Sequence, residues 1–182
     1  MQKNKDYSQF LNQYFRDTAG VIKEISHGGW RGEYDHNSMH LDEHLIFDTR
    51  NGFVSVSMKI GFTLTDSGVE LTFSPSVGVT GETASVTQSI PVHEVQVASK
   101  HVLRAEREST PSGATFKYNP FTLRPKLDIA QQAYEAILSG DSNGYKKCVW
   151  RLADDAYSHA QHIIGAIVRE WGSTLKLKTL EI

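Results

Sequence analysis

The feature that most constrains the fold is a run of strict alternation at residues 53–64, "FVSVSMKIGFTL". Its apolar members are Val54, Val56, Met58, Ile60, Phe62 and Leu64. Because successive side chains of a strand point to opposite faces, this period of two predicts a long strand with one buried face. A strand of that kind requires a sheet whose apolar face is covered by another layer.

The segments on either side of this strand predict its neighbours. The turn sequence "TDSG" at 65–68 is followed by renewed alternation over 69–73, which indicates a hairpin. A second turn, "TRNG" at 49–52, contains Asn-Gly and predicts that residues 39–48 also pair with the long strand. We therefore expect consecutive antiparallel strands across this region.

Further strands are expected in the middle of the chain. Residues 85–97, "SVTQSIPVHEVQV", predict one strand. Pro91 must lie at an edge, at a bulge or at the start of a new segment, because proline cannot donate to a ladder. Residues 101–108 and 114–118 flank "STPSG" and predict a second hairpin.

The N-terminal segment has helical periodicity instead. Residues 6–25 place apolar side chains at three- and four-residue spacings, which predicts an amphipathic helix. Asp6 is suited to cap its start, and "HGG" at 27–29 is suited to end it. Because glycine weakens a helix, Gly20 predicts that the last turn ends near Ala19.

Helical periodicity returns in the C-terminal third. Asp128 is placed to cap a helix that stops at Gly140, and a longer helix is predicted from Tyr145 to Trp171. The final residues 175–182, "LKLKTLEI", alternate and predict a short last strand. One helix, a block of strands and two helices predict a single α+β domain over residues 1–182. Its sheet is expected to be largely antiparallel, with about four to six strands.

Cysteine content and hydropathy predict the compartment. Cys148 is the single cysteine of the sequence, so no intrachain disulfide forms, which favours a reducing environment. The first residues, "MQKNKDYSQF", lack the apolar centre of a secretory signal, and no apolar run approaches the ~20 residues that span a bilayer. We expect a cytoplasmic protein without a membrane partner. Cys148 borders the apolar stripe of its helix, which favours a buried, unreactive thiol.

The stretch "HNSMHLDEH" at 36–44 is a candidate metal site. Its last five residues, "HLDEH", resemble the H-x-x-E-H motif of the inverted zinc peptidases, the pitrilysin-like family. The resemblance implies that His40 and His44 bind zinc from one helix and that Glu43 activates a water molecule. Strand periodicity contradicts the helix and separates His40 from His44 by ~13 Å, too far to share one ion. His40 with Asp42, or Asp42 with His44, still suits a divalent ion if a third ligand comes from elsewhere.

A second candidate metal cluster lies in the long C-terminal helix. Asp155, His159 and His162 follow each other at spacings of four and three, which places them on one helix flank. They form either a metal site completed from another element or a polar flank with a local Asp–His pair. Zinc or another divalent ion is the only cofactor that the sequence suggests, and the fold does not require it.

Residues 100–126 form a basic segment with a net charge of +4, whereas residues 31–99 carry −6. Within it, "KYNPFTLRPK" interleaves aromatic and basic side chains, which suits stacking on bases and contact with phosphates. The candidate binding residues are Lys117, Tyr118, Phe121, Arg124 and Lys126. The alternative interpretation is a connection whose Phe121 and Leu123 pack on the core while its charges face solvent.

The motifs of common enzyme classes do not occur in this sequence. We find no phosphate-binding loop, dinucleotide fingerprint or serine-hydrolase elbow. The sequence favours a non-catalytic binding or assembly protein over an enzyme. Its long strands leave a sheet edge that a symmetric copy would cover, so a homo-oligomer is expected, with another protein as a further partner. Two alternatives stay open: a nucleic-acid-binding module using residues 100–126, and a metal-dependent hydrolase using the histidine clusters.

Overall fold

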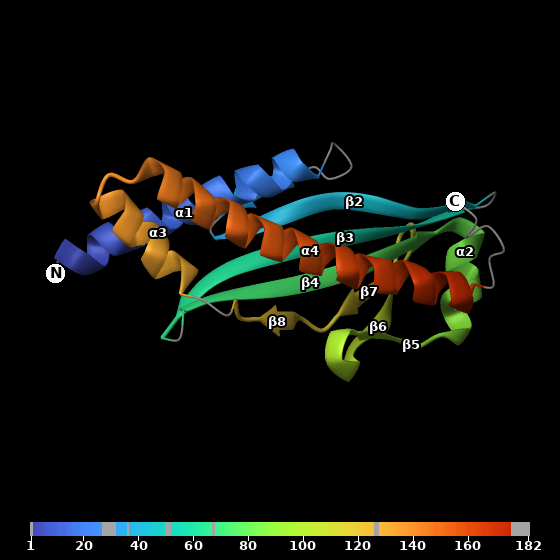
Figure 1. The fold of residues 1–182 in the computed structure, drawn as a ribbon. Coiled ribbons are helices and arrows are strands. Elements are labelled where there is room, and N and C mark those ends of the chain that lie inside the picture. The colour runs from blue at the N-terminus through green and yellow to red at the C-terminus, as the bar shows by residue number, and fades with distance from the viewer. Residues whose placement is uncertain are drawn as a thin grey trace. The chain divides into compact units, whose positions relative to one another are not determined.

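A computed structural model describes residues 2–26, 32–35, 37–49, 52–66, 68–125 and 128–175. They form an α+β fold with an N-terminal helix, an antiparallel sheet and C-terminal helices (Figure 1). The helices are α1 (Gln2–Ile25), α2 (Gly81–Val86), α3 (Ile129–Leu138) and α4 (Ser142–Thr174), with short 3-10 turns η1 (Thr87–Ser89) and η2 (Ala98–Lys100). The strands are β1 (Gly32–Asp35), β2 (Ser38–Thr49), β3 (Gly52–Thr65), β4 (Gly68–Thr80), β5 (Val92–Val97), β6 (His101–Thr110), β7 (Gly113–Tyr118) and β8 (Phe121–Leu123).

Strand pairing within the described residues gives an eight-stranded sheet in the order β1-β2-β3-β4-β7-β6-β5, with β8 paired to β4. The β1–β2, β4–β7, β5–β6 and β6–β7 ladders are antiparallel. The prediction of about four to six strands is therefore too low. β1 and β8 contain 4 and 3 residues, too few for a period of two to stand out in the sequence.

The chain forms two compact units. The first unit comprises residues 1–42, 59–73 and 122–158, and the second comprises residues 43–58, 74–121 and 159–182. The elements β2, β3, β4, β8 and α4 contribute residues to both units. The expectation of a single domain stays a prediction.

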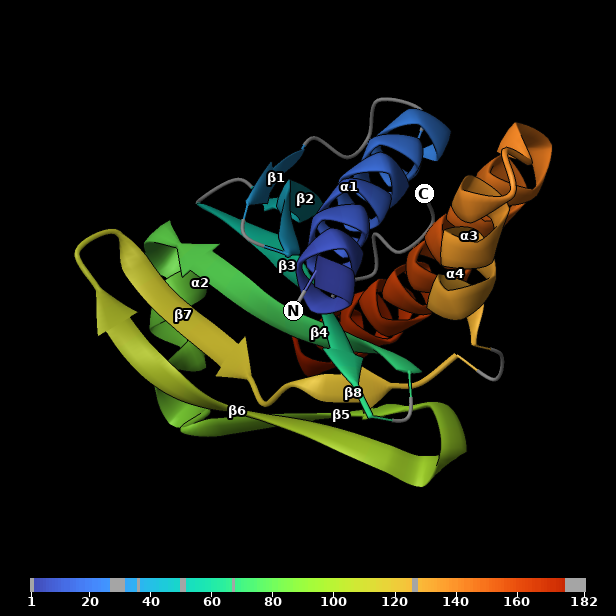
Figure 2. The same ribbon diagram turned by 90° about the vertical axis from the view of Figure 1, so that its left-hand side faces the viewer.

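In the first unit, α1 packs against α3 and the beginning of α4 (Figure 2). The Tyr14 hydroxyl of α1 donates to the main-chain carbonyl of Cys148 in α4, at 3.0 Å. On the sheet side, Phe15 of α1 stacks on Phe62 of β3 with ring centroids 5.5 Å apart. In this unit the N-terminal helix therefore packs on the apolar face of β3 at Phe62.

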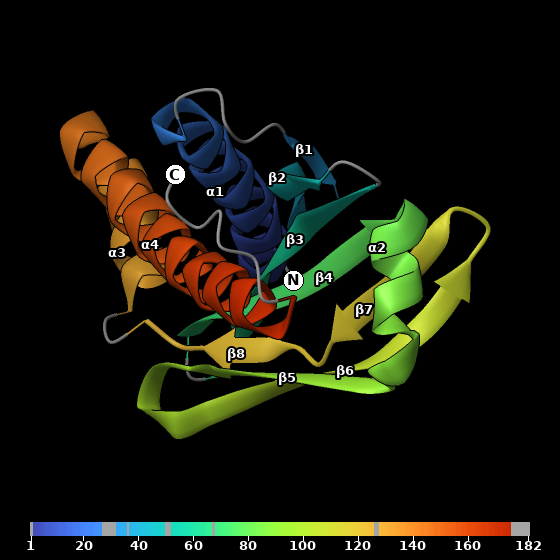
Figure 3. The same ribbon diagram turned by 90° about the vertical axis from the view of Figure 1, so that its right-hand side faces the viewer.

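In the second unit, β5, β6 and β7 present one face to the last turns of α4, and α2 lies against β7 (Figure 3). The ring of Trp171 in α4 lies 5.0 Å from that of Phe116 in β7, in a T-shaped arrangement. The Arg107 guanidinium of β6 donates to the Ala84 carbonyl at 3.3 Å and to the Thr87 hydroxyl at 3.1 Å. A cation thus satisfies acceptors at the C-terminal end of α2, where the helix dipole is negative.

The histidine-bearing segment is a strand, as the alternation predicts. It forms β2, in which Met39 and Leu41 are buried while His40 between them is exposed. The side chains of residues 42–49 lie outside the description. The long alternating segment is likewise confirmed as β3, whose apolar positions from Val54 to Phe62 are buried.

Both boundaries of α1 differ from the predictions. The helix begins at Gln2, so the predicted cap Asp6 lies inside it. α1 continues through Gly20 to Ile25, so the prediction that it ends near Ala19 is wrong. Ile22 is fully buried, and its packing offsets the ~1 kcal/mol that a glycine costs a helix. The predicted stop at 27–29 lies outside the described residues.

Residues 85–97 do not form one strand, which corrects the prediction for this segment. α2 and η1 occupy the first part, and β5 begins directly after Pro91. The Thr87 hydroxyl donates to the Ala84 carbonyl at 2.6 Å. The guanidinium of Arg107 in β6 donates to the same carbonyl, so both groups stabilise this helical turn. Because β5 begins at Val92, Pro91 lies at the start of a new segment, which is one of the three placements expected for it. The hairpin predicted downstream is confirmed as β6 and β7.

The C-terminal helices are confirmed. The Asp128 carboxylate accepts a hydrogen bond from the main-chain N–H of Gln131 at 3.3 Å and caps α3. α4 is longer than predicted, and its apolar stripe from Val149 to Trp171 is buried. Most of the predicted last strand, residues 176–182, lies outside the description. None of the described helices is both long and apolar enough to cross a membrane.

Candidate functional site

His93, in β5, is a buried histidine of the second unit. The sequence "VHEVQV" alternates, so His93 shares the inner face of β5 with Val95 and Val97. Its side chain is only 5% exposed. A buried imidazole needs hydrogen-bond partners for its ring nitrogens.

Both ring nitrogens of His93 have a partner. Nδ1 lies 2.8 Å from the Tyr118 hydroxyl of β7, and Nε2 lies 2.9 Å from the Thr174 hydroxyl at the end of α4. The indole N–H of Trp171 donates to the same Tyr118 hydroxyl at 2.8 Å. The Thr174 hydroxyl donates to the Glu170 carbonyl at 2.8 Å. We call these five residues the His93 network.

The bond directions fix the tautomer of His93. Thr174 has one hydroxyl proton, which the Glu170 carbonyl accepts, so Thr174 must accept a proton from Nε2. Nε2 is therefore protonated, and Nδ1 accepts the hydroxyl proton of Tyr118. Tyr118 in turn accepts from Trp171. This assignment satisfies all four bonds with a neutral imidazole.

The surroundings of His93 oppose a positive charge on the ring. Burial lowers the pKa of His93 from 6.5 to about 4. Burial also raises the pKa of the Tyr118 phenol, which keeps its proton available to Nδ1. Within the described residues, every buried side-chain nitrogen and oxygen atom has a hydrogen-bond partner. The His93 network is therefore suited to holding the end of α4 against β5 and β7, rather than to exchanging protons with a ligand.

The edge of β5 that is directed away from β6 differs from its buried inner face. Within the described part of the chain, β5 pairs with β6 alone and stands at the end of the strand order (Figure 3). The N–H of Arg107 donates to the carbonyl of Pro91 at 3.0 Å, which marks these two as a hydrogen-bonded pair. Hydrogen-bonded and non-bonded pairs alternate along an antiparallel ladder. The main-chain groups of Val92, Glu94 and Gln96 therefore point away from β6.

A second main-chain hydrogen bond, made by β6, supports this assignment of inward and outward groups. Arg104 is opposite Glu94 in the ladder, and its carbonyl accepts from the Asn119 N–H at 2.9 Å, on the side away from β5. The main chain of Arg104 thus does not bond Glu94. Glu94 and Gln96 also expose their side chains on the outer face of β5. We call the outward main-chain groups of Val92, Glu94 and Gln96 the β5 edge.

The predicted nucleic-acid-binding residues have different surroundings. Lys117 is exposed, whereas Tyr118 is 4% exposed and belongs to the His93 network, so its ring has no face available for stacking on a base. Phe121 is half-buried, with its ring 4.9 Å from that of His101. Lys126 lies outside the described residues.

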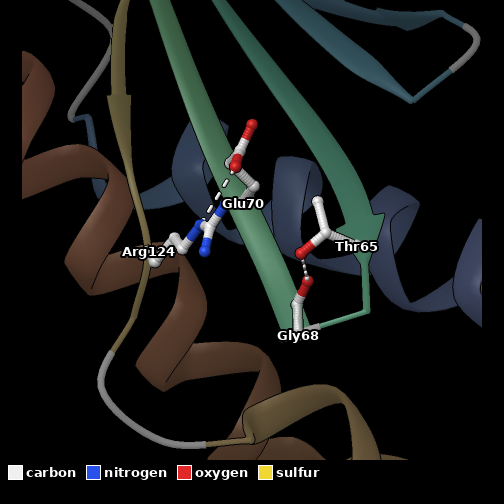
Figure 4. A network of polar contacts seen from close by, with 4 residues as sticks. All are labelled: Thr65, Gly68, Glu70 and Arg124. Carbon is white, nitrogen blue, oxygen red and sulfur yellow. Dashed lines mark hydrogen bonds and ion pairs between the residues drawn. The ribbon is translucent and has the colours of Figure 1, made fainter.

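Arg124, the remaining member, belongs to the first unit. Its Nε donates to the Glu70 carboxylate at 3.2 Å, beside the turn in which the Thr65 hydroxyl donates to the Gly68 carbonyl at 3.0 Å (Figure 4). The ion pair neutralises Arg124 locally, although its side chain is 60% exposed. The nucleic-acid site stays a prediction.

The predicted metal ligands are partly described. His40 is exposed on β2, and the side chains of Asp42 and His44 lie outside the description. On α4, His162 is exposed, while Asp155 and His159 are half-buried. No group of three or more His, Cys, Asp and Glu side chains among the described residues is arranged to hold a metal ion. The metal sites stay predictions, but the resemblance to the inverted zinc peptidases fails because "HLDEH" lies on a strand.

Comparison with known proteins finds no matching family model, no matching curated protein and no matching solved structure. The functional argument therefore depends on the chain's own residues. Sequence reasoning did not identify His93 as a central residue. In a strand, His93 lies on the same face as Val95 and Val97, so the sequence places an ionisable group on an apolar face.

Proposed function

We propose that this protein is a non-catalytic binding or assembly protein that self-associates through the β5 edge. The observation that supports the proposal is the hydrogen bond from Arg107 to Pro91, because it directs the main-chain groups of three β5 residues away from β6. Unpaired N–H and C=O groups at a sheet edge are a template for another strand.

The composition of β5 supports the same proposal. Proteins often protect an edge strand with lysine, with proline or with a bulge. The 6 residues of β5 contain neither lysine nor proline, and their register with β6 is continuous from Val92 to Val97. Three of the six are valine, which favours extended structure. The edge is thus suited to receive a strand.

The inner face of β5 supports a rigid role for this strand. His93 is held by Tyr118 and Thr174 through its two ring nitrogens. A strand fixed in this way loses little conformational entropy when a partner strand binds, and such preorganisation strengthens association. The His93 network therefore stabilises the strand that carries the binding edge.

Sedimentation equilibrium of the purified chain tests the proposal. We expect a concentration-dependent dimer for the unmodified protein. Gln96→Pro removes an outward N–H without removing a bond to β6 and is expected to abolish the dimer. Gln96→Ala keeps the N–H and is the matched control, which should dimerise normally. A chain that stays monomeric at millimolar concentration would refute the proposal.

A further inference from the structure

We propose that the β5 strands of two copies pair antiparallel with Glu94 facing Glu94 of the second copy across a two-fold axis, so that this carboxylate pair regulates assembly. The inference rests on the proposed function and adds the register and its control by charge.

Main-chain geometry limits the registers to a few. Only residues whose N–H and C=O groups point outward can form the bonded pairs of a new ladder, and these are Val92, Glu94 and Gln96. A shift by one residue would oppose outward groups to inward ones, and it would also turn the side chains of the second copy to the wrong face. In the registers that remain, Glu94 faces Ile90, Val92, Glu94, Gln96 or Ala98 of the second copy.

The register centred on Glu94 makes the most main-chain bonds. It pairs Glu94 with its own copy and pairs Val92 with Gln96 on both sides of the axis, so all outward residues are used. The register that places Glu94 opposite Gln96 leaves Val92 opposite Ala98, which belongs to a 3-10 turn and not to β5. The register centred on Gln96 likewise brings Ala98 opposite Glu94. The two registers that place Glu94 opposite Val92 or Ile90 bring Ile90, which precedes β5, into the ladder. Additional main-chain bonds outweigh a like-charge contact between solvent-exposed side chains.

Arg104 makes the contact between the two carboxylates tolerable. Its guanidinium Nη1 lies 3.6 Å from the Glu94 carboxylate, and both side chains are more than half exposed, at 59% and 56%. Around the two-fold axis the outer face then carries Arg104, Glu94 and their two symmetry copies, a row without net charge. The two carboxylates are nevertheless adjacent, so their residual repulsion opposes assembly and is screened by salt.

The small size of the contact makes this charge effect measurable. A ladder confined to the 6 residues of β5 is much smaller than a standard protein interface, so the dimer is expected to be weak. In a weak dimer, a change of one charge pair alters the population of dimer directly.

Salt dependence tests the charge control. We expect the association constant to rise between about 0.05 M and about 0.5 M salt, the opposite of an assembly driven by charge attraction. Glu94→Gln should raise the constant about two- to fivefold at low salt and remove the salt dependence. Glu108→Gln changes the same charge at an exposed position on β6 and should leave the constant unchanged. A constant that falls with salt, or that falls in Glu94→Gln, would overturn the inference.

Disulfide trapping tests the register. With a mild oxidant added to accept the two electrons, Glu94→Cys without a second substitution is expected to form an intermolecular disulfide, because facing residues of an antiparallel ladder lie within disulfide distance. Trapping by Gln96→Cys alone, or only by the double variant with both cysteines, would show another register. The unmodified chain controls for the buried Cys148. A dimer that Gln96→Pro abolishes but Glu94→Cys does not trap would refute the register while leaving the proposed function standing. A chain without any dimer would refute both.

Discussion

The indole ring of Trp171 stacks on the imidazole of His93, with ring centroids 4.2 Å apart and ring planes inclined by 21°. The same indole donates its N–H to Tyr118, which bonds His93 from β7. Trp171 of α4 thus contacts the His93 ring directly. It also donates a hydrogen bond to Tyr118, the residue that donates to His93. This arrangement excludes water from an ionisable ring and explains the low pKa of His93.

We predict that the free energy of unfolding falls as the pH is lowered from about 6.5 to about 4. The folded chain keeps His93 neutral down to a pKa of about 4, whereas the group titrates near 6.5 in the unfolded chain, so the unfolded state binds more protons in this window. The loss amounts to ~3 kcal/mol, since each pKa unit corresponds to ~1.4 kcal/mol. Above pH ~6.5 the titration of this group should add no further pH dependence to the stability.

Urea unfolding at several pH values measures this effect. His93→Gln removes the titrating group and should flatten the pH dependence between about 4 and 6.5, even though it lowers stability at neutral pH. His101→Gln is the control, because His101 is exposed on β6. An unchanged pH dependence in His93→Gln would contradict the prediction.

We predict that Tyr118→Phe lowers the free energy of unfolding by ~1–3 kcal/mol. The substitution keeps the ring but leaves the Trp171 N–H without its acceptor and His93 Nδ1 without its donor. Tyr157→Phe, at a half-buried position on α4, is the matched control and should change stability far less. Equal stability of both variants in chemical denaturation would show that the His93 network contributes little.

The fold was predictable where one local pattern decides the structure. The alternation of β2 and β3 and the stripe of α4 are visible in the sequence because burial repeats with the period of the element. The helical turn at α2 was not predictable from its own residues. Its acceptors bond Arg107, 23 residues from Ala84, and local propensity contains no information about that contact.

The His93 network shows why the site was harder to predict than the fold. His93 lies 25 residues from Tyr118 and 81 residues from Thr174, so only the tertiary structure brings them together. Tyr118 was assigned to a binding loop because of its basic neighbours. Its alternation with Ala114 and Phe116 would have placed it on the buried face, where the structure has it.

We predict that the protein folds without a bound metal ion. EDTA should lower its melting temperature by less than about one or two degrees, because a tightly bound structural ion stabilises the folded state by mass action. Re-addition of zinc to the treated sample is the control. A large decrease that zinc reverses, together with stoichiometric zinc in the untreated protein, would favour the metal-dependent alternative that uses His40, Asp42 and His44 or Asp155, His159 and His162.

The nucleic-acid alternative makes a last prediction, which depends on the Arg124–Glu70 ion pair. If Arg124 and Lys126 contact phosphate, replacing both with alanine should reduce the salt slope of single-strand binding by about two units, since each contact releases condensed counterions. Glu70→Gln removes the carboxylate that lies 3.2 Å from Arg124 and should then strengthen binding. Lys59→Ala, an exposed position on β3, is the control.

Tyr118 separates two explanations of any such binding. A stacked ring would make Tyr118→Ala cost ~1–3 kcal/mol of affinity. The burial of Tyr118 in the His93 network instead predicts that Tyr118→Phe, which removes only the hydroxyl, destabilises the fold, whereas an exposed stacking ring would lose its hydroxyl without a change in stability. Undetectable binding to single-stranded DNA and RNA at low salt would eliminate the nucleic-acid alternative, because phosphate contacts are strongest there.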